Sequence, residues 1–575
     1  MRLIELSANK ETFKTVTFNP SGLSLIIAHK EDPDSKSTFN SVGKSLMIAL
    51  VHFCLGTKKN NEFKEKLKDW VFTLRFSIND TEYTAIRSTA EQEIIVLNGQ
   101  KKSVRLFNDF MFDQLFKYEN SESFLSFRSL ISRFIRQGKA GYVTFNKFIS
   151  KENAITELVN NSFLLGLDVS RIITKNKLRK EYEDIEKLRK NIENNSEFKA
   201  LFTSKKIKDI DIHIQTSKEN IENLTNSIEN FIIAENYSQL KKEADNISNQ
   251  LNHLRNKLTL SNIALENIIK SLKIRPDVTY DEINALYEQA KINFPDIIKK
   301  QLKEVEHFHN SIVDERSLRL KKEKEKIDKR IIEINEQIKY QEKAEDSILQ
   351  QLSDKGALEE YTALNQRLSK IKSEYENLEF LKKMTTQFKN RLSEIKSDFE
   401  KENIATNNYL IDEYSATKEE NIKIFKSIAH EFYPNKIAGI EINNHDGNNQ
   451  IRYEINATIN TDAGDAVGNM KLFCFDWMIL QSKHNHNIQY ILHDSRITAD
   501  VDPRQIAILL KYAYRKSKET NTQYIIALNE NTLYNAKEYL TDEEYNEIYG
   551  CKVLKLSDAS NADKLLGEYI EMDYE

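Results

Sequence analysis

Hydrophobic positions recur at two different spacings, and these spacings divide the chain into a middle and two ends. In the middle, apolar residues separated mainly by Lys, Glu, Asn and Ser follow short steps of three or four: Leu240, Ala244, Ile247, Leu251, Leu254 and Leu258. The rhythm returns further along the chain: Tyr361, Leu364, Leu368, Ile371, Tyr375, Leu378, Leu381, Phe388, Leu392, Ile395 and Phe399. A seam with a period of about 3.5 residues is typical of a coiled coil. The seam breaks between Phe231 and Leu240 and around Ser353 to Gly356, where we expect joints or a local loss of supercoil.

The two ends contain short runs that are apolar or alternate between apolar and polar residues, which favours β-strands. We expect strands at residues 23–27, 70–76, 93–97, 452–459 and 524–528. The run His445-Asp446-Gly447-Asn448, between two such segments, is typical of a hairpin turn. Two mixed α/β ends joined by a coil predict one globular domain that is split in sequence and reassembled when the helices fold back.

Turn-forming residues are scarce. The chain of 575 residues has only 14 Gly and 6 Pro, which argues against a β-sandwich, a propeller or a loop-rich scaffold. Between Gly166 and Gly439 the only glycine is Gly356, and the only prolines between Pro33 and Pro434 are Pro276 and Pro295. We therefore predict a long antiparallel coiled-coil hairpin. The predicted parts are an N-terminal lobe at 1–165, an outgoing arm at 166–265, a helical tip at 266–300, a returning arm at 301–430 and a C-terminal lobe at 431–575.

The overall charge and the cysteines point to an ordinary intracellular protein. With 84 Lys and Arg against 88 Asp and Glu, the net charge of −4 shows no general basic bias toward nucleic acid. Cys54, Cys474 and Cys551 are too far apart in sequence to indicate a metal motif or a disulfide framework. Neither a signal sequence nor a long apolar window is evident, so we expect a cytoplasmic protein with no membrane contact.

The sharpest local signal is the run Thr38-Phe39-Asn40-Ser41-Val42-Gly43-Lys44-Ser45, which follows an apolar strand and precedes an apolar helix. A phosphate-binding loop needs this context, because backbone N–H groups at a helix N-terminus cradle the phosphates. In such a loop Lys44 reaches the β- and γ-phosphates and the Ser45 hydroxyl binds Mg²⁺. The usual pattern G-x-x-x-x-G-K-[ST] begins with a glycine, and Thr38 stands at that position.

An acidic partner for Mg²⁺ is expected at the end of a second strand. The apolar run at 488–493 ends at Asp494, which suits that role, although an exposed aspartate that closes an αβ unit is the ordinary alternative. The next residue is Ser495, where many such ATPases have a glutamate that activates water, and a serine alone cannot accept that proton. Asp500 and Asp502 are the candidate substitutes, and slow hydrolysis is the alternative.

Taken together, these features resemble the SMC-like and RecN-like branch of the ABC ATPases. In that family a split head carries the phosphate loop in its N-terminal part and the acidic strand in its C-terminal part, with a coiled-coil hairpin between them. The run from Asn40 to Ser45 looks like the family's N-G-x-G-K-S loop, with Ser41 replacing a glycine. Gln137, in FIRQGKAGY, looks like the glutamine that senses Mg²⁺ and the attacking water. The resemblance implies a split α/β ABC-type ATPase head, ATP and Mg²⁺ as cofactors, and a homodimer formed through the heads.

Two further family motifs are altered. The signature motif L-S-G-G, which touches nucleotide bound to the other head, is replaced by a run without a glycine pair, and Gly468 and Asn469 are its candidate phosphate contacts. Asn529, after YIIAL, stands where the family has a switch histidine. It would position water or phosphate, or it is a turn residue.

A narrower resemblance comes from the runs HDSRITADVDPRQ, GNMKLFCFDWMIL and YIIALNEN, which look like the SMC-like ATPase subunit of bacterial ABC three-component and Lamassu-type antiphage defence systems. It implies an accessory subunit and a separate effector, often a nuclease. We therefore expect an SMC-like ATPase that senses or clamps double-stranded DNA and controls such an effector in antiphage or anti-plasmid defence. A nucleotide-locked coiled-coil scaffold with little or no ATP hydrolysis is the alternative.

Basic residues of the first lobe are candidates for contact with duplex phosphates, or else part of a solvated surface. They are Lys101, Lys102, Arg105, Arg133, Arg136, Lys139 and Lys147.

Overall fold

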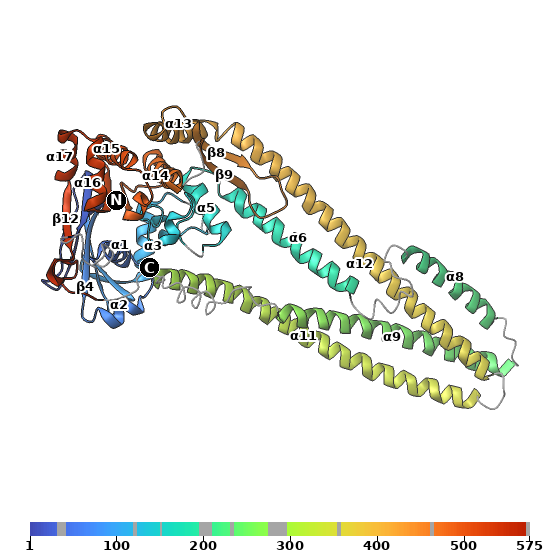
Figure 1. Ribbon diagram of the computed structural model, residues 1–575. Helices are drawn as coiled ribbons and strands as arrows, with labels where there is room; N and C mark the ends of the chain where they lie inside the picture. Colours follow the sequence, from blue (N-terminus) through green and yellow to red (C-terminus); the bar gives the residue numbers. More distant parts are fainter. Residues whose placement is uncertain are drawn as a thin grey trace. The chain divides into compact units, whose positions relative to one another are not determined.

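The computed structural model describes residues 1–30, 42–118, 124–149, 152–194, 210–229, 235–273, 296–352, 358–460 and 465–570. The described residues of Met1–Asn176, Thr279–Phe308 and Lys401–Glu575 belong to one compact unit, which we call the head unit. Those of Lys177–Val278 and His309–Glu400 belong to a second, which we call the helical unit. Figure 1 labels most of the helices of both units and some strands of the head unit.

A six-stranded antiparallel sheet forms one part of the head unit. Its strands follow the spatial order β2-β1-β4-β5-β6-β7. They are β1 (Arg2–Ala8), β2 (Val16–Thr17), β4 (Val71–Ile78), β5 (Thr81–Ser88), β6 (Ile94–Leu97) and β7 (Gln100–Ser103). Side chains of β4 alternate between buried and half-buried positions, as expected for a strand with one face on the core. The strands predicted at 70–76 and 93–97 are thus present.

A four-stranded parallel sheet combines strands from both ends of the chain. Its order is β10-β11-β3-β12, with every neighbouring pair parallel. The strands are β3 (Gly22–His29), β10 (Tyr490–His493), β11 (Gln523–Asn529) and β12 (Lys552–Ser557). β3 and β11 are buried along almost their whole length, which suits a parallel sheet covered on both faces. Because the strands are parallel, their carboxyl ends lie along one edge.

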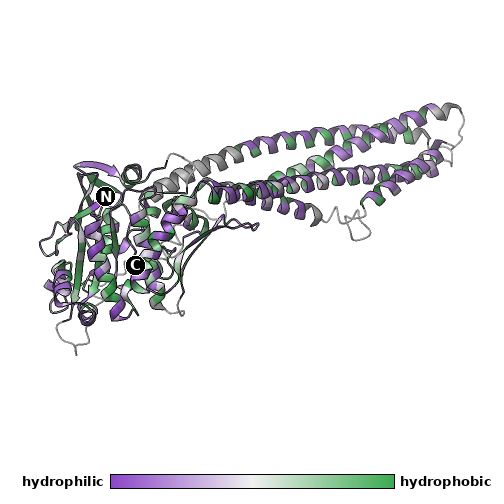
Figure 2. Cartoon of the chain, turned by 90° about the horizontal axis from the view of Figure 1, so that it is seen from above, coloured by the Kyte–Doolittle hydropathy of each residue, from purple (hydrophilic) through white to green (hydrophobic). Residues whose placement is uncertain are grey.

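Helices and a hairpin complete the head unit. The hairpin pairs β8 (Ala438–Asn444) with β9 (Tyr453–Ile459), so the turn predicted at 445–448 lies where expected. The helices are α1 (Lys44–Cys54), α2 (Asn61–Lys66), α3 (Val104–Leu115), α4 (Phe127–Ile131), α5 (Ala154–Leu164), α13 (Ser415–Phe432), α14 (Asp465–Ser482), α15 (Pro503–Glu519), α16 (Glu530–Ala536) and α17 (Asp542–Gly550). Figure 2 shows apolar residues gathered along the strands and the helices that cover them.

Five long helices supply the helical unit, and three of them, α6, α11 and α12, also have residues that belong to the head unit. They are α6 (Ser170–Asn194), α8 (Ile210–Glu229), α9 (Glu235–Lys273), α11 (Asp296–Leu352) and α12 (Leu358–Ile411). Members of the predicted seams are buried here, among them Leu251 at 1% and Ile395 at 0% exposure. The apolar periodicity therefore identifies the packed faces of these helices correctly.

The direction of α8 relative to α12 follows from two apolar clusters. Ile210, at the start of α8, clusters with Leu378, which lies 17 positions beyond Tyr361 along α12. Ile228, at the end of α8, clusters with Tyr361 near the start of α12. The two helices therefore run antiparallel, as a hairpin requires.

The direction of α9 corrects the prediction of one simple hairpin. The Tyr361 hydroxyl donates to Asp245 Oδ1 (2.8 Å), and Ser373 Oγ donates to Asn256 Oδ1 (2.9 Å). Residue numbers rise together in these pairs, so α9 runs parallel to α12 (Figure 1). The chain predicted as one outgoing arm at 166–265 thus reverses between α8 and α9, where the seam breaks. Periodicity reports which face is buried, and it carries no information on helix direction.

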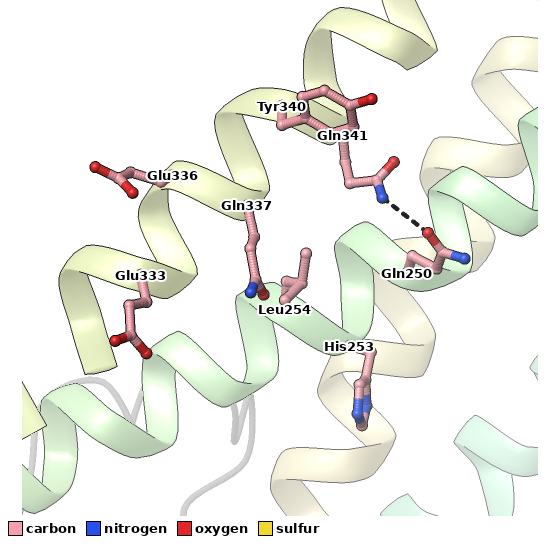
Figure 3. Close-up of a pocket in the computed structure, with 8 residues that line it drawn as sticks. All are labelled: Gln250, His253, Leu254, Glu333, Glu336, Gln337, Tyr340 and Gln341. Atoms are coloured by element: carbon pink, nitrogen blue, oxygen red, sulfur yellow. Dashed lines mark hydrogen bonds between the residues drawn. The ribbon is translucent and has the colours of Figure 1, made fainter. Parts of the chain in front are cut away.

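Residues 274–295, which make up most of the predicted tip, lie outside the described residues. α9 and α11 border a polar groove of about 520 Å³, shown in Figure 3. Its lining residues are Gln250, His253, Leu254, Glu333, Glu336, Gln337, Tyr340 and Gln341. None of the predicted nucleotide-binding residues is among them.

Candidate functional site

α1 begins directly after a glycine in a left-handed conformation. Gly43 precedes the helix with φ at +107°, a conformation that favours glycine. A Cβ placed there would lie 2.5 Å from Leu565 Cβ, and Leu565 N–H donates to the carbonyl of Val42 (3.0 Å). The end of the loop is therefore held by the C-terminal segment. Asn40 and Ser41 lie outside the described residues.

Lys44 begins α1 and points at the end of β11. Its Nζ donates to Asn529 Oδ1 over 2.8 Å. Burial lowers the pKa of Lys44 from 10.5 to about 8, and the carboxylate of Asp494 opposes that shift. Asn529 thus lies in contact with the lysine of its own chain, in the place where the resemblance puts the switch residue.

Ser45 and Asp494 are brought together from opposite ends of the sequence. Ser45 Oγ donates to Asp494 Oδ2 over 2.7 Å. Hydroxyl and carboxylate oxygens are ligands that Mg²⁺ takes, so this pair fits the metal expected with ATP. The other carboxylate oxygen of Asp494 accepts hydrogen bonds from the backbone N–H (2.6 Å) and the hydroxyl (3.1 Å) of Ser495. Ser495 therefore orients the aspartate.

The segment that contains Gln137 runs alongside β10, so Gln137 lies at the same edge of the sheet as Asp494. Ile135 forms a parallel bridge with Leu492 of β10. Gln137 comes two residues after Ile135, and Asp494 comes two residues after Leu492. Because the two segments run parallel and both residues come two positions after the bridge, Gln137 and Asp494 lie beside each other at the end of these segments.

The two candidate bases differ in their surroundings. Asp502 caps α15, and its Oδ1 accepts from the N–H groups of Arg504 (2.8 Å) and Gln505 (3.3 Å). Asp500 is exposed and adopts a left-handed φ of 57°. The carboxylate of Asp502 thus caps the N-terminus of α15, a role that the sequence analysis did not predict.

Gly468 and Asn469 both lie in the first turns of α14. Gly468 is exposed, and a Cβ added there would meet nothing within 4 Å. Asn469 is 9% exposed, and its side-chain amide donates to the carbonyl of Ala499 (2.7 Å). Asn469 therefore anchors the loop that follows β10, and Gly468 leaves the start of α14 open.

Two of the predicted DNA contacts are wrong. Arg133 is 1% exposed and donates to both carboxylate oxygens of Glu152. Arg136 is 0% exposed and pairs with Asp476. A guanidinium paired and buried in this way cannot reach a duplex phosphate. Lys101 and Lys139 are exposed and stay candidates.

Sequence reasoning missed Tyr142, which belongs to the site. Its hydroxyl accepts the backbone N–H of Asp494 over 2.7 Å. His29 and Glu530 form a second unforeseen pair at the same edge, and Lys555 also donates to Glu530 (3.1 Å). Tyr142 follows Gln137 by only five positions in the quoted run FIRQGKAGY, and that proximity was the one available signal.

None of the helices in the described parts of the chain combines the length and the apolar character that a membrane crossing needs.

Comparisons with known proteins relate the chain to proteins of two kinds. Residues 428–569 match a family described as an uncharacterised protein conserved in bacteria (DUF2326). An uncharacterised protein of Bacillus subtilis (strain 168), YydD, is 24% identical over 604 residues, which cover 97% of this chain and 96% of that protein. Most of the candidate residues of the C-terminal lobe thus lie inside the matched region.

The solved structures to which the chain is similar include Smc head domains that carry coiled coil. One from Pyrococcus yayanosii, with a coiled coil and joint, is 14% identical with a TM-score of 0.33, and 93% of each chain is covered. Another, from Pyrococcus furiosus and bound to the C-terminal domain of ScpA, is 11% identical with a TM-score of 0.34, covering 93% of this chain and 92% of that one.

Proposed function

We propose that the chain is an SMC-like ATPase whose head binds ATP and Mg²⁺ at the carboxyl edge of the parallel sheet. The observation that carries this proposal is the hydrogen bond between Ser45 and Asp494 (2.7 Å). These are the two residues expected to hold Mg²⁺, and they come from strand–helix units 449 positions apart in sequence. The bond between Lys44 and Asn529 supports the same site from its other side.

Each side chain then has a defined task. The N–H groups at the start of α1 and the Lys44 ammonium bind the phosphates, and Ser45, Asp494 and Gln137 supply oxygen ligands to the metal. Mg²⁺ bound there would neutralise phosphate charge. Asn529 holds the Lys44 ammonium at 2.8 Å, so the cation is oriented before ligand arrives. Asp500 is the carboxylate we assign as proton acceptor for the attacking water, because Asp502 already caps a helix.

The test is the binding of mant-ATP, a fluorescent ATP analogue, followed by ATP turnover. We expect Lys44→Ala to abolish both, because the variant loses the phosphate-binding cation. Lys58→Ala is the matched control, since Lys58 is as buried as Lys44 (4% against 5% exposed) but is not assigned to the site. Equal nucleotide affinity in wild type and Lys44→Ala would refute the proposal.

We further propose that two heads dimerise over ATP, with the open start of α14 at Gly468 facing nucleotide on the other copy, and that closure clamps double-stranded DNA. An accessory subunit and a separate effector of a defence system, working in the cytoplasm, would read out that closure. The support is the resemblance of the C-terminal runs and the exposed Lys101 and Lys139. Linear duplex DNA should stimulate turnover, and Lys101→Glu with Lys139→Glu should weaken the stimulation without changing basal turnover.

A nucleotide-locked scaffold is the second candidate function, and Ser495 favours it. The Ser495 hydroxyl donates a hydrogen bond to Asp494, and a serine alone cannot act as a general base. In that case mant-ATP binds with dependence on Lys44, while turnover stays negligible even with DNA. Asp500→Asn separates the candidates, because it lowers turnover only if hydrolysis uses that carboxylate.

A further inference from the structure

A chain of fully buried polar side chains lies directly behind the candidate Mg²⁺ ligands. Its members are Arg136, Asp476, His493 and Tyr524, each 0–1% exposed. Two of them adjoin candidate metal ligands in sequence: Arg136 precedes Gln137, and His493 precedes Asp494. Asp476 lies on α14. Burying a charge is costly unless it is paired and hydrogen-bonded, so a buried group of this kind needs complete partners.

Asp476 is the centre of the chain. Arg136 donates to it from two nitrogens, including Nη2 to Oδ1 over 2.7 Å. His493 Nε2 lies 2.9 Å from Asp476 Oδ2, and His493 Nδ1 lies 2.9 Å from the Tyr524 hydroxyl. An ionised carboxylate only accepts hydrogen bonds, so we assign the proton to Nε2, and the tyrosine hydroxyl donates to Nδ1.

The remaining donors of Arg136 organise the loop that begins at Gln137. Nη1 donates to the carbonyl of Gly141 (2.6 Å), and Nη2 donates to that of Phe145 (2.7 Å). Tyr142 lies between these two residues, and its hydroxyl accepts the N–H of Asp494. The contacts therefore close a ring from Asp476 through Arg136 and the loop to Asp494, and back through His493.

We propose that Asp476 is a positioning residue for the nucleotide site, which fixes Asp494 through His493 and fixes the loop of Gln137 and Tyr142 through Arg136. The inference rests on the proposed function, because the ring acts on the metal ligands assigned there. It extends that function by making α14, the helix that starts at Gly468, an integral part of the Mg²⁺ site. We assign Asp476 no direct contact with nucleotide or metal, because its carboxylate oxygens bond to Arg136 and His493.

The experiment measures the Mg²⁺ concentration that gives half-maximal binding of mant-ATP to the full chain. Asp476→Asn keeps the size of the side chain but removes its charge, and we expect it to raise that concentration about 10- to 100-fold, the usual effect of losing an outer partner of a metal ligand. Affinity for mant-ATP without Mg²⁺ should stay unchanged. Tyr524→Phe removes one hydroxyl. It should raise the Mg²⁺ concentration for half-maximal binding about fivefold, the effect expected for the loss of one hydrogen bond.

Two matched controls separate positioning from general loss of stability. Glu152→Gln breaks the Arg133–Glu152 pair, which is equally buried (side chains 0% and 3% exposed) but does not touch Asp494. Tyr512→Phe removes a hydroxyl from the same aromatic group, where Tyr512 packs on Trp477 and accepts from Gln481. Both should leave the Mg²⁺ requirement within about twofold of wild type, a change below that expected for one hydrogen bond.

The outcomes are distinguishable. An unshifted Mg²⁺ requirement in Asp476→Asn, or an equal shift in Glu152→Gln, overturns the inference and leaves the proposed function standing. Absence of Lys44-dependent binding of mant-ATP in the wild type overturns both. If Asp476→Asn does not fold, as judged by its melting temperature, Tyr524→Phe decides the matter: a shift relative to Tyr512→Phe supports the inference, and equality refutes it.

Discussion

One ion pair of the head unit and one of the helical unit differ in their access to water. Arg136 and Asp476 of the head unit pair with both side chains 0% exposed. In the helical unit, Arg391 pairs with Glu181 while the side chains stay 46% and 41% exposed. A buried pair leaves an uncompensated charge when one partner is removed, whereas an exposed partner is simply rehydrated. We therefore expect the buried pair to matter more for stability than the exposed one.

The same contrast explains how each unit keeps its shape. The head unit combines a continuous apolar core with polar groups whose partners come from distant parts of the chain. The helical unit relies on small apolar clusters along its seams, such as that of Leu251, Ile334 and Ile338. Figure 2 shows that hydrophilic residues predominate along the helices of this unit, with hydrophobic residues interspersed among them. Substitution of a buried apolar residue should therefore lower the stability of either unit. Substitution of a charged residue should lower stability strongly only where its ion pair is buried, as in the head unit.

The largest effect is expected for Arg136→Leu. The variant leaves Asp476 buried without its cation, so we expect a loss of about 3–5 kcal/mol in the free energy of unfolding of the head unit. Trp70 and Trp477 are the only tryptophans and are both buried in the head unit, so urea unfolding followed by tryptophan fluorescence reports it selectively. A midpoint equal to that of wild type would contradict the comparison.

Leu251→Ala should act on the helical unit by a loss of about 2–5 kcal/mol, because it leaves a cavity in a buried seam. Hydrogen exchange of α9 should accelerate, while the tryptophan transition of the head unit stays in place. Leu260→Ala is the control on the same helix, because Leu260 is 40% exposed where Leu251 is 1% exposed. Equal effects of the two substitutions would mean that the seam is misassigned.

A pH-dependent effect is expected at Lys175, which is 0% exposed and donates to the carbonyl of His445. Burial, helped by nearby Arg452, lowers the pKa of Lys175 from 10.5 to about 8. The unfolded chain then binds more protons between these values, so the cost of burying the charge is present below pH 8 and fades as the pH rises to about 10.5.

Lys175→Met removes that cost and should stabilise the head unit by about 1–2 kcal/mol at pH 7, allowing for solvent screening. The advantage over wild type should shrink when the fluorescence-detected urea midpoints are measured again at pH 9.5. An advantage that does not change with pH would show that the ammonium is not the source of the effect.

The smallest effect is expected for Arg391→Ala in α12. An exposed pair contributes little to stability and is screened by salt, so the stability of the helical unit should change little, and less still at high ionic strength. Circular dichroism at two salt concentrations measures this change. A loss as large as that of Arg136→Leu would break the comparison between the two units.

Much of the fold could be predicted because the type of a secondary-structure element depends on the pattern of apolar and polar residues within a short stretch of sequence. The strands at 23–27 and 524–528, the hairpin turn at 445–448 and the seam residues appear where the patterns indicate. Lys44, Ser45 and Asp494 were recognisable because each follows or begins a strongly apolar element. The reversal between α8 and α9 was not, because a helix has the same apolar period in either direction.

The sequence by itself determined the type of each element and the identity of the residues at the carboxyl ends of the parallel strands. Only the tertiary structure decided which of these residues meet and which charged side chains are buried. Arg136 looked like a surface cation because its partner Asp476 is 340 positions away. Periodicity is set by neighbours a few residues apart, whereas burial and pairing depend on segments that meet only after the chain has folded.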